Sequence, residues 1–379
     1  MEKHFVYADN AATTRVSDSV VQAMLPYYSE TYGNPSAAYS FAGRAKEGLD
    51  TARAQVAAAL NASPEEIYFV SCGTEADNWA LKGGAALRAS RGRHIISTAF
   101  EHHAVLHSLD ALVKQGFEIT LLPVHGDGLV RMADLEAAIR PDTILVSVMF
   151  ANNEIGTIQP IAEIGALCRA RDILFHTDAV QAIGHVPVDV QAMQIDMLAL
   201  SGHKFHAPKG VGALYLRRGL HIPNFMDGGG QENKKRAGTE AVPAIVGLGR
   251  AIEDAVAKLP EEAARVAALR DRLIAGILDR FPNAKLNGHP TKRLPGNVNV
   301  SFPGVEGPDL LALLDLAGIC AASGSACTAG NRNPSHVLTA IGLNQATAQG
   351  SLRLSFAEYS TESDVDYILQ ELERAIAQL

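Results

Sequence analysis

Lys204 follows an apolar run that is typical of a buried strand, in the segment ALSGHKFHAPKG. An amine just past such a strand points into the adjoining cleft, where it can bond covalently to a carbonyl-bearing cofactor. Ser201 and His203 stand beside it as candidate phosphate donors. Lys209 is a rival amine, but its APKG context is typical of a turn. The spacing therefore favours Lys204.

Asp178 ends another apolar run, in ILFHTDAVQAIG. A carboxylate there is costly to bury unless it meets a positive partner, and a protonated pyridine nitrogen is one such partner. Capping of the next helix is the alternative. Gln181 lies three residues on and can reach the same face. It is a candidate for hydrogen bonding to a ring hydroxyl.

Gly73 and Thr74 fall between an apolar run and a helical segment, in FVSCGTEADNWAL. Backbone amides at the positive end of a helix bind phosphate, and the Thr74 hydroxyl can add to them. A Thr followed by Glu-Ala is also an ordinary helix N-cap, so this feature is weak by itself. Its value lies in its combination with the amine and the acid.

His102 follows a further apolar run, in STAFEHHAVL. An imidazole there can stack on a cofactor ring and move protons near neutral pH. His103 and His107 are interpreted as polar residues of a helix start, and no zinc site is expected, because adjacent histidines on a helix diverge. An amine, an acid, a phosphate cup and a ring cover are what pyridoxal 5'-phosphate requires of a protein. The sequence predicts a site for this cofactor and no metal.

The elements that position these residues alternate between short apolar runs and longer stretches of helical period. This pattern predicts an α/β fold with a mainly parallel sheet and helices on both faces. Ligands of such sheets collect at the C-terminal ends of the strands. The expected strands are 67–71, 94–100, 117–124, 143–150, 173–178, 197–201 and 212–217, and helical stretches include 74–89 and 161–172.

The pattern changes after about residue 258, where a charged helical run over 260–281 leads into a section with fewer strands, at 297–302, 318–323 and 351–356. A chain of 379 residues exceeds the usual size of one domain. We expect an N-terminal segment over 1–16 that packs with the small domain, a large cofactor-binding domain over 17–258 and a smaller α+β domain over 259–379. The Gly-rich stretch 225–240 resembles a surface loop, and its basic cluster fits a solvated face equally well.

Composition excludes several classes of function. A formal net charge of −8 and a pI near 5.9 argue against nucleic acid or an anionic membrane as the partner. The sequence shows no signal peptide and no apolar run of about 20 residues, which favours a cytoplasmic protein. The four cysteines lack the CxxC spacing of zinc sites, and three of them read as packed small hydrophobes: Cys72, Cys168 and Cys320.

Several long blocks resemble the cysteine desulfurases of the NifS type, in the same order along nearly the whole chain. They are YADNAATT, the run from Val70 to Leu81, ANNEIGTIQPI, HTDAVQAIGHVPVDV, LSGHKFHAPKGVGALYLRRG, RAGTEAVPAIVGLG and SGSACT. The resemblance implies a homodimeric pyridoxal-phosphate enzyme of fold type I with a seven-stranded sheet. It also implies that Lys204 bonds the cofactor, with the contacts already assigned to Asp178, Gln181, His102, Thr74, Ser201 and His203.

Four further roles come from the resemblance. Thr239 of the RAGTE block would reach the phosphate from the other subunit, and Asn153 and Arg353 would bind the substrate carboxylate. Cys327, in the small-residue stretch ASGSACTAGNRNPSHVL, would take sulfur from L-cysteine as a persulfide and pass it to an acceptor such as an iron–sulfur scaffold. A mobile loop would suit both steps. The sequence departs from the family pattern at Cys72, where a Gly is usual.

Three functions other than cysteine desulfurase remain as alternatives. Selenocysteine lyase is the nearest relative in chemistry, and an aminotransferase is a further candidate that has no need of the Cys327 thiol. A protein of a different class, a sulfur-delivery or assembly subunit that mainly binds partners, is the third. The full set of cofactor residues argues against that last one.

Overall fold

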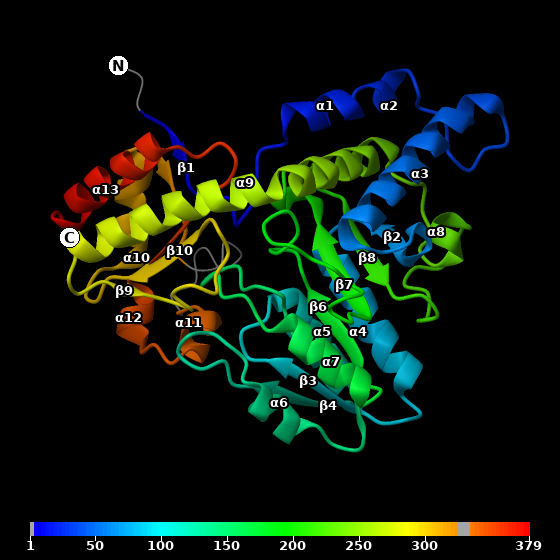
Figure 1. Cartoon of the computed structure of the whole chain (residues 1–379), viewed down its shortest axis with the longest axis horizontal. Coiled ribbons are helices and arrows are strands. Elements are labelled where there is room, and N and C mark those ends of the chain that lie inside the picture. Colours follow the sequence, from blue (N-terminus) through cyan, green and yellow to red (C-terminus); the bar gives the residue numbers. More distant parts are fainter. Residues whose placement is uncertain (1–3, 324–333) are drawn as a thin grey trace.

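A seven-stranded sheet forms the centre of the larger part of the molecule (Figure 1). The computed structural model describes residues 4–323 and 334–379. The strand order is β2-β8-β7-β6-β5-β3-β4; β8 runs antiparallel to both neighbours and the other pairs are parallel. All seven expected strands are present: β2 Ile67–Val70, β3 His94–Thr98, β4 Glu118–Leu122, β5 Thr143–Ser147, β6 Leu174–Asp178, β7 Met197–Ser201 and β8 Gly212–Leu216.

Helices cover both faces of this sheet, as the pattern predicted. Helices α4 and α5 pack on one face, and α1, α3, α7 and the first part of α9 pack on the other, each face with its own apolar core. Alternate residues of a strand therefore enter different cores. The bounds of the elements around the sheet are α1 Asp18–Met24, α2 Pro26–Ser29, α3 Ser40–Leu60, η1 Pro64–Glu66, α4 Gly73–Arg88, α5 His103–Val113, α6 Met132–Ala138, α7 Ile161–Ala170, η2 Gly202–Lys204, α8 Gln231–Lys234 and α9 Val242–Arg280.

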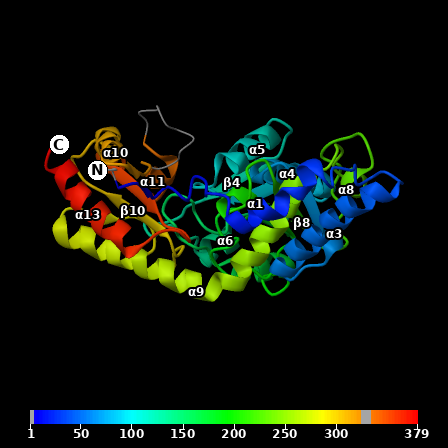
Figure 2. The same cartoon turned by 90° about the horizontal axis from the view of Figure 1, so that it is seen from above.

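The 39-residue helix α9 joins the two parts of the molecule, and both views show it running along them (Figures 1 and 2). It is continuous through residues 258 and 259 and contains Pro260, which lacks the N–H that a helix interior uses. The chain thus passes the expected domain boundary within a helix, and that boundary stays a prediction.

The smaller part has a separate apolar core, made by α9 beyond Val266, its own strands and α13. Strands β12, β10 and β9 form an antiparallel sheet, and β1 pairs with β11 in parallel, so the N-terminal segment packs against this part. The remaining bounds are β1 Val6–Tyr7, β9 Lys285–Leu286, β10 Asn297–Ser301, α10 Gly307–Leu316, β11 Ile319–Cys320, α11 His336–Ala340, α12 Gln345–Gln349, β12 Ser351–Ser355 and α13 Glu362–Ile376.

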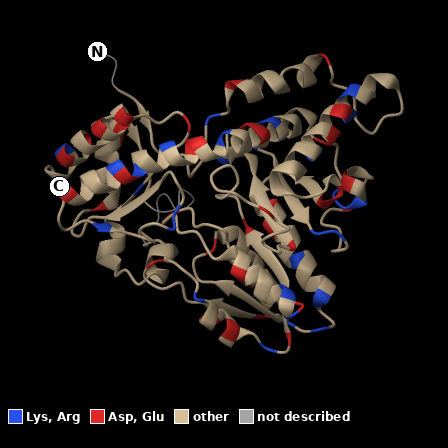
Figure 3. Ribbon diagram, viewed as in Figure 1, with Lys and Arg blue, Asp and Glu red and all other residues tan. Residues whose placement is uncertain are grey.

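Charged residues of both signs alternate along the outer helices (Figure 3). The chain as a whole has a formal net charge of −8. Within residues 4–323 and 334–379, no helix combines the length and apolar character needed to cross a membrane.

Candidate active site

A cavity of about 250 Å³ opens where β6 and β7 end, between the two parts of the molecule. The N-terminal segment and the start of α4 form two of its walls, and β12 of the smaller part contributes a third. The lining includes ten residues predicted from the sequence: Gly73, Thr74, His102, Asn153, Asp178, Gln181, Ser201, His203, Lys204 and Arg353. The structure therefore brings together nearly the whole predicted set.

Lys204 ends the short helix η2 and its amine lies in this cavity, whereas Lys209 is exposed and does not line it. The Lys204 Nζ donates to two main-chain carbonyl oxygens, at 2.6 Å to Ala11 and 2.8 Å to Ala12. Gln181 Nε2 donates to the same Ala11 oxygen at 3.0 Å. The N-terminal segment thus holds the amine in place, and sequence reasoning missed this because the contacts use backbone atoms.

Asp178 ends β6 and is buried in the cavity floor. Burial raises the pKa of its carboxyl, against the opposing effects of His102, the Val180 N–H and Lys204. Its Oδ1 accepts from the Val180 N–H at 2.9 Å, but this is a contact within a turn, because no helix lies in the fully described stretch between β6 and β7 and the alternative of a helix cap is therefore wrong. The carboxylate still faces the cavity and can receive a cationic partner there.

Asp77 and His176 are buried neighbours of this floor that the sequence analysis did not single out. Asp77 Oδ1 lies 3.4 Å from His176 Nε2, and each atom lacks a hydrogen-bond partner within the described chain. The other His176 nitrogen, Nδ1, lies 2.9 Å from Ser147 Oγ. Burial raises the pKa of Asp77 well above its ordinary value and lowers that of His176 to about 3, so the His176 imidazole is neutral near pH 7.

The start of α4 forms a cradle of backbone amides. Cys72 occupies the N-cap position without a side-chain cap, so Thr74 is not the cap and the first N–H groups of the helix remain available to an anion. A Cβ added at Gly73 would come within 2.6 Å of Val180 Cγ2, so only glycine fits this close approach. Ser201 and His203 face the same cavity. Burial and the nearby Lys204 and Lys209 lower the pKa of His203 to about 4, which leaves a neutral imidazole.

His102 caps α5, and its Nδ1 accepts the Ala104 N–H at 3.1 Å. That bond places the proton of a neutral ring on Nε2. Burial lowers the pKa of His102, while Asp178 opposes this and Lys204 adds to it. His102 is therefore a neutral donor and acceptor at the cavity wall. Its neighbours His103 and His107 stack on each other, and in the described ranges no group of three such side chains is arranged to hold a metal ion.

Glu101 is buried behind His102 and supplies a test of the site's electrostatics. Burial raises its pKa to about 8, although its Oε1 accepts from Thr98 Oγ1 and the Met149 N–H. The folded protein thus keeps a proton that the unfolded chain releases near its ordinary value, so the free energy of unfolding falls as pH rises through this interval. The Glu101→Gln variant should lose this component, about 1.4 kcal/mol per pH unit.

The measurement is chemical denaturation between pH 5.5 and 8, compared with wild type. Glu65→Gln is the matched control, because the Glu65 side chain is 75% exposed. An unchanged slope for Glu101→Gln would contradict the assignment of a buried proton to Glu101.

Arg353 lies in β12 and is almost fully buried, with 1% of its side chain exposed. Its Nη2 donates to Asp9 Oδ1 at 2.7 Å and its Nη1 to the Asn153 carbonyl oxygen at 3.2 Å. Its Nε is buried without a hydrogen-bond partner in the described chain. A planar fork with an unmatched donor suits a carboxylate ligand. The sequence predicted Arg353 and Asn153 here but missed Asp9.

Two predicted residues are not placed in this cavity. Thr239 is exposed and does not line it, and Cys327 lies outside the described residues. The described chain on both sides of residues 324–333 contacts the cavity's surroundings. Ala322 exchanges two backbone hydrogen bonds with Arg353, and Ser335 Oγ donates to Glu154 Oε2 at 2.5 Å.

The profile of the family described as Aminotransferase class-V matches residues 6–368. The chain belongs to this family. Among curated relatives of this class-V protein, the cysteine desulfurase IscS of Clostridium botulinum (strain Kyoto / Type A2) is 54% identical over 375 residues, which cover 98% of this chain and 94% of the relative. The cysteine desulfurase IscS of Methanosarcina thermophila is 53% identical over 378 residues, covering 100% and 93%.

Solved structures of similar proteins superpose on this class-V chain over most of its length. A NifS-like protein superposes with a TM-score of 0.93 at 41% identity, covering 99% of this chain and 100% of the other. The structure described as SspA in complex with cysteine has a TM-score of 0.83 at 38% identity, covering 94% and 100%. The expected fold, a mainly parallel seven-stranded sheet with helices on both faces, is confirmed.

The structure corrects the expectations for two of the cysteines in this class-V protein. Cys168 is buried as expected, but Cys72 and Cys320 are partly exposed, and Cys72 lines the cavity. The reason is that β2 ends at Val70, two residues earlier than a packed Cys72 would need. The stretch 225–240 is also more than a solvated loop, since Glu232 is buried and binds Arg53 through both carboxylate oxygens, at 2.7 and 2.8 Å.

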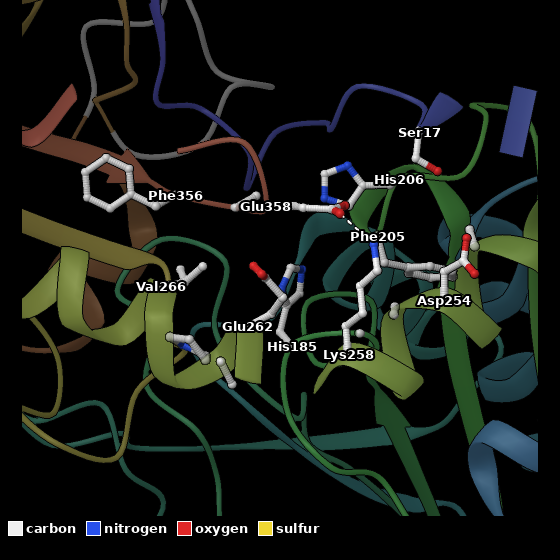
Figure 4. A pocket seen from close by; sticks show the side chains of 16 residues that line it. Ser17, His185, Phe205, His206, Asp254, Lys258, Glu262, Val266, Phe356 and Glu358 are labelled. Atoms are coloured by element: carbon white, nitrogen blue, oxygen red, sulfur yellow. Dashed lines mark hydrogen bonds and ion pairs between the residues drawn. The ribbon is translucent and has the colours of Figure 1, made fainter. Parts of the chain in front are cut away.

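A second hollow of about 70 Å³ lies against α9 on the other side of the η2 backbone (Figure 4). Its charged lining residues already have partners within the protein. Lys258 Nζ binds Glu358 Oε1 at 2.7 Å, and Glu262 binds Arg265. His185 Nε2 lies 3.0 Å from the Lys204 carbonyl oxygen. This hollow supports the backbone of Lys204 and presents no set of convergent reactive groups.

Proposed function

We propose that this protein is a pyridoxal-phosphate-dependent cysteine desulfurase that converts L-cysteine to L-alanine and transfers the sulfur to Cys327 as a persulfide. The observation that carries the proposal is the meeting of Lys204, Asp178 and Arg353 in one cavity. An amine, a buried acid and a buried guanidinium are the groups needed for the cofactor and for the carboxylate of an amino acid.

The residues present fit the cofactor. Asp178, buried at the floor, would meet the ring nitrogen, Gln181 the ring hydroxyl and His102 the ring itself. The uncapped start of α4, with Ser201 and His203, supplies donors for the phosphate, and Gly73 leaves the close approach that it needs. Lys204 would hold the cofactor covalently through its amine. When bound, pyridoxal phosphate supplies an electrophilic carbon for the substrate amine and a sink for the electrons of the Cα–H bond.

The chain's own groups then have distinct tasks. Arg353 and Asn153 bind the substrate carboxylate and so fix the orientation of the amino acid. Lys204 Nζ would take the proton from the substrate Cα, and His102 Nε2 is placed to give or take protons at the cavity wall. Asp178 would supply the carboxylate for the ring nitrogen, beside the buried pair Asp77 and His176.

The sulfur step requires a nucleophile from outside the cavity wall. The Cys327 thiolate attacks the substrate sulfur, an S–S bond forms as the C–S bond breaks, and the carbon takes protons to leave as L-alanine. The overall balance is L-cysteine plus enzyme thiol giving L-alanine plus enzyme persulfide. The contacts of Ala322 and Ser335 support this role, because they bring both described flanks of residues 324–333 beside Arg353 and Glu154.

The test is release of L-alanine from L-cysteine and L-selenocysteine by the purified protein. A desulfurase turns over both compounds, whereas a selenocysteine lyase discriminates strongly against cysteine. An aminotransferase forms no persulfide from either, and an assembly subunit of low activity releases no alanine. The persulfide sulfur then passes to an iron–sulfur scaffold or another cytoplasmic acceptor.

The proposal includes a homodimer in which Thr239 acts in the partner's site. Thr239 is exposed and stands outside the cavity of its own chain. The turn that leads to it is held firmly: Glu232, Asn233 and Lys234 have φ of 44°, 55° and 65°, and the Phe69 N–H and Arg53 anchor Glu232. Such left-handed backbone persists where surrounding contacts stabilise it and often marks a functional loop.

Mixing two variants tests this arrangement. Thr239→Ala alone should weaken cofactor binding about tenfold, the value of one hydrogen bond to a charged group. Refolding Thr239→Ala together with Lys204→Ala forms hybrid dimers with one intact site, which should restore about a quarter of wild-type turnover. If Thr239 serves its own subunit, the mixture shows no gain over the separate variants.

A further inference from the structure

Asp9 does not line the cavity, yet it makes the one ion pair that Arg353 has with the described residues. Its position is well defined: Asp9 bridges to Ser355, and the neighbouring Ala8 carbonyl oxygen accepts the Ser355 N–H at 2.7 Å. The carboxylate therefore approaches Arg353 from the N-terminal segment rather than from the cavity. Asp9 is partly exposed, at 18%, whereas Arg353 is 1% exposed.

The hydrogen bonds that Arg353 makes within the described chain leave N–H donors of its guanidinium for another group. A guanidinium has five N–H donors in a fixed plane. Asp9 takes one at Nη2 through a single oxygen, the Asn153 carbonyl takes one at Nη1, and Nε remains buried without a partner in the described chain. The edge formed by Nε and Nη2 can therefore still accept a carboxylate in two places.

A second buried acid, Glu154, interacts with Arg353. Burial raises the pKa of Glu154, whereas the Ser335 hydroxyl and then Arg353 lower it. A buried guanidinium that loses its ion-pair partner leaves an uncompensated charge, which costs several kcal/mol. Asp9 is the partner that compensates this charge among the described residues.

The same N-terminal segment also holds Lys204. Ala11 and Ala12, two and three residues after Asp9, accept the hydrogen bonds of the Lys204 amine. The N-terminal segment therefore contacts two groups of the site. One is Lys204, on the amine side of an amino-acid substrate, and the other is Arg353, on its carboxylate side.

We propose that Asp9 is a positioning residue for the substrate carboxylate, acting through Arg353. Asp9 holds the guanidinium with its Nε–Nη2 edge available, so the site selects amino acids with a free carboxylate. This inference rests on the proposed function, because it requires an amino-acid substrate bound at Lys204.

The experiment compares L-alanine with L-alaninamide on the cofactor-loaded protein, followed by the change in cofactor absorbance. The two ligands share the amine, and only alanine carries a carboxylate. Asp9→Asn should weaken alanine binding about tenfold or more and leave alaninamide binding within about twofold. Asp9→Glu keeps the charge and should give an intermediate ratio. Asp18→Asn is the matched control, since Asp18 is an exposed acid at the start of α1, paired with Arg15.

Each result decides something. Equal weakening of both ligands in Asp9→Asn, or unchanged alanine binding, would overturn the positioning role. If Asp9→Asn does not accumulate as folded protein, the Asp9→Glu ratio carries the test in the same way. A wild-type protein that binds neither ligand would instead overturn the proposed function, and the inference with it.

Discussion

Replacing Lys204 with Ala should remove the covalent link to the cofactor and lower turnover of L-cysteine by at least about 10³-fold. The loss combines the nucleophilic amine with the base that takes the Cα proton. The two carbonyl oxygens that hold the amine, from Ala11 and Ala12, cannot replace either task. The measurement is the absorbance of the purified variant loaded with pyridoxal phosphate, together with alanine release.

Lys209→Ala is the matched control for this prediction. Lys209 lies five residues on, is exposed and does not line the cavity, so its loss should leave both the spectrum and turnover near wild type. Borohydride reduction should fix the cofactor to the peptide that contains Lys204. A Lys204→Ala protein with a wild-type spectrum would move the covalent link to another lysine.

Replacing Cys327 with Ser should abolish persulfide formation and alanine release from L-cysteine while the cofactor stays bound. A hydroxyl cannot accept sulfur from the substrate, but none of the cavity's cofactor groups is changed. The readouts are alanine, protein-bound sulfur and the cofactor spectrum with and without L-cysteine. The spectrum should still respond to L-cysteine, because binding precedes sulfur transfer.

The control that matters most here is Cys72→Ser. Cys72 lines the cavity and is the thiol that the structure places nearest to the predicted phosphate cradle. We expect Cys72→Ser and Cys320→Ser to retain persulfide formation on Cys327. Full activity of Cys327→Ser, or loss of persulfide in Cys72→Ser alone, would reassign the sulfur carrier.

The site residues that the sequence predicted share a local signal. Asp178, Lys204 and His102 each follow an apolar run, and the ends of parallel strands meet at one edge of the sheet. Period and composition are enough to locate such positions. The full length of helix α9 was harder to predict from the sequence. A Pro within a helical pattern usually marks a helix boundary, yet Pro260 lies inside α9.

The missed residues depend on contacts between distant parts of the chain. Asp9 and the Ala11 carbonyl reach the site only because β1 pairs with β11. Asp77 had a usable signal: Gly73, Asp77 and Ala80 follow a four-then-three spacing, so they share the buried face of α4. An acid on a stripe of small buried residues is expected to meet a partner in the core, and His176 is the neighbour found there.

A single turnover of the purified protein with L-cysteine, in the absence of reductant, tests the transfer of sulfur to Cys327 most directly. We expect one L-alanine per active site and, in equal amount, a gain of one sulfur atom on the peptide that contains Cys327. Alanine without added sulfur on Cys327, or no alanine at all, would contradict it.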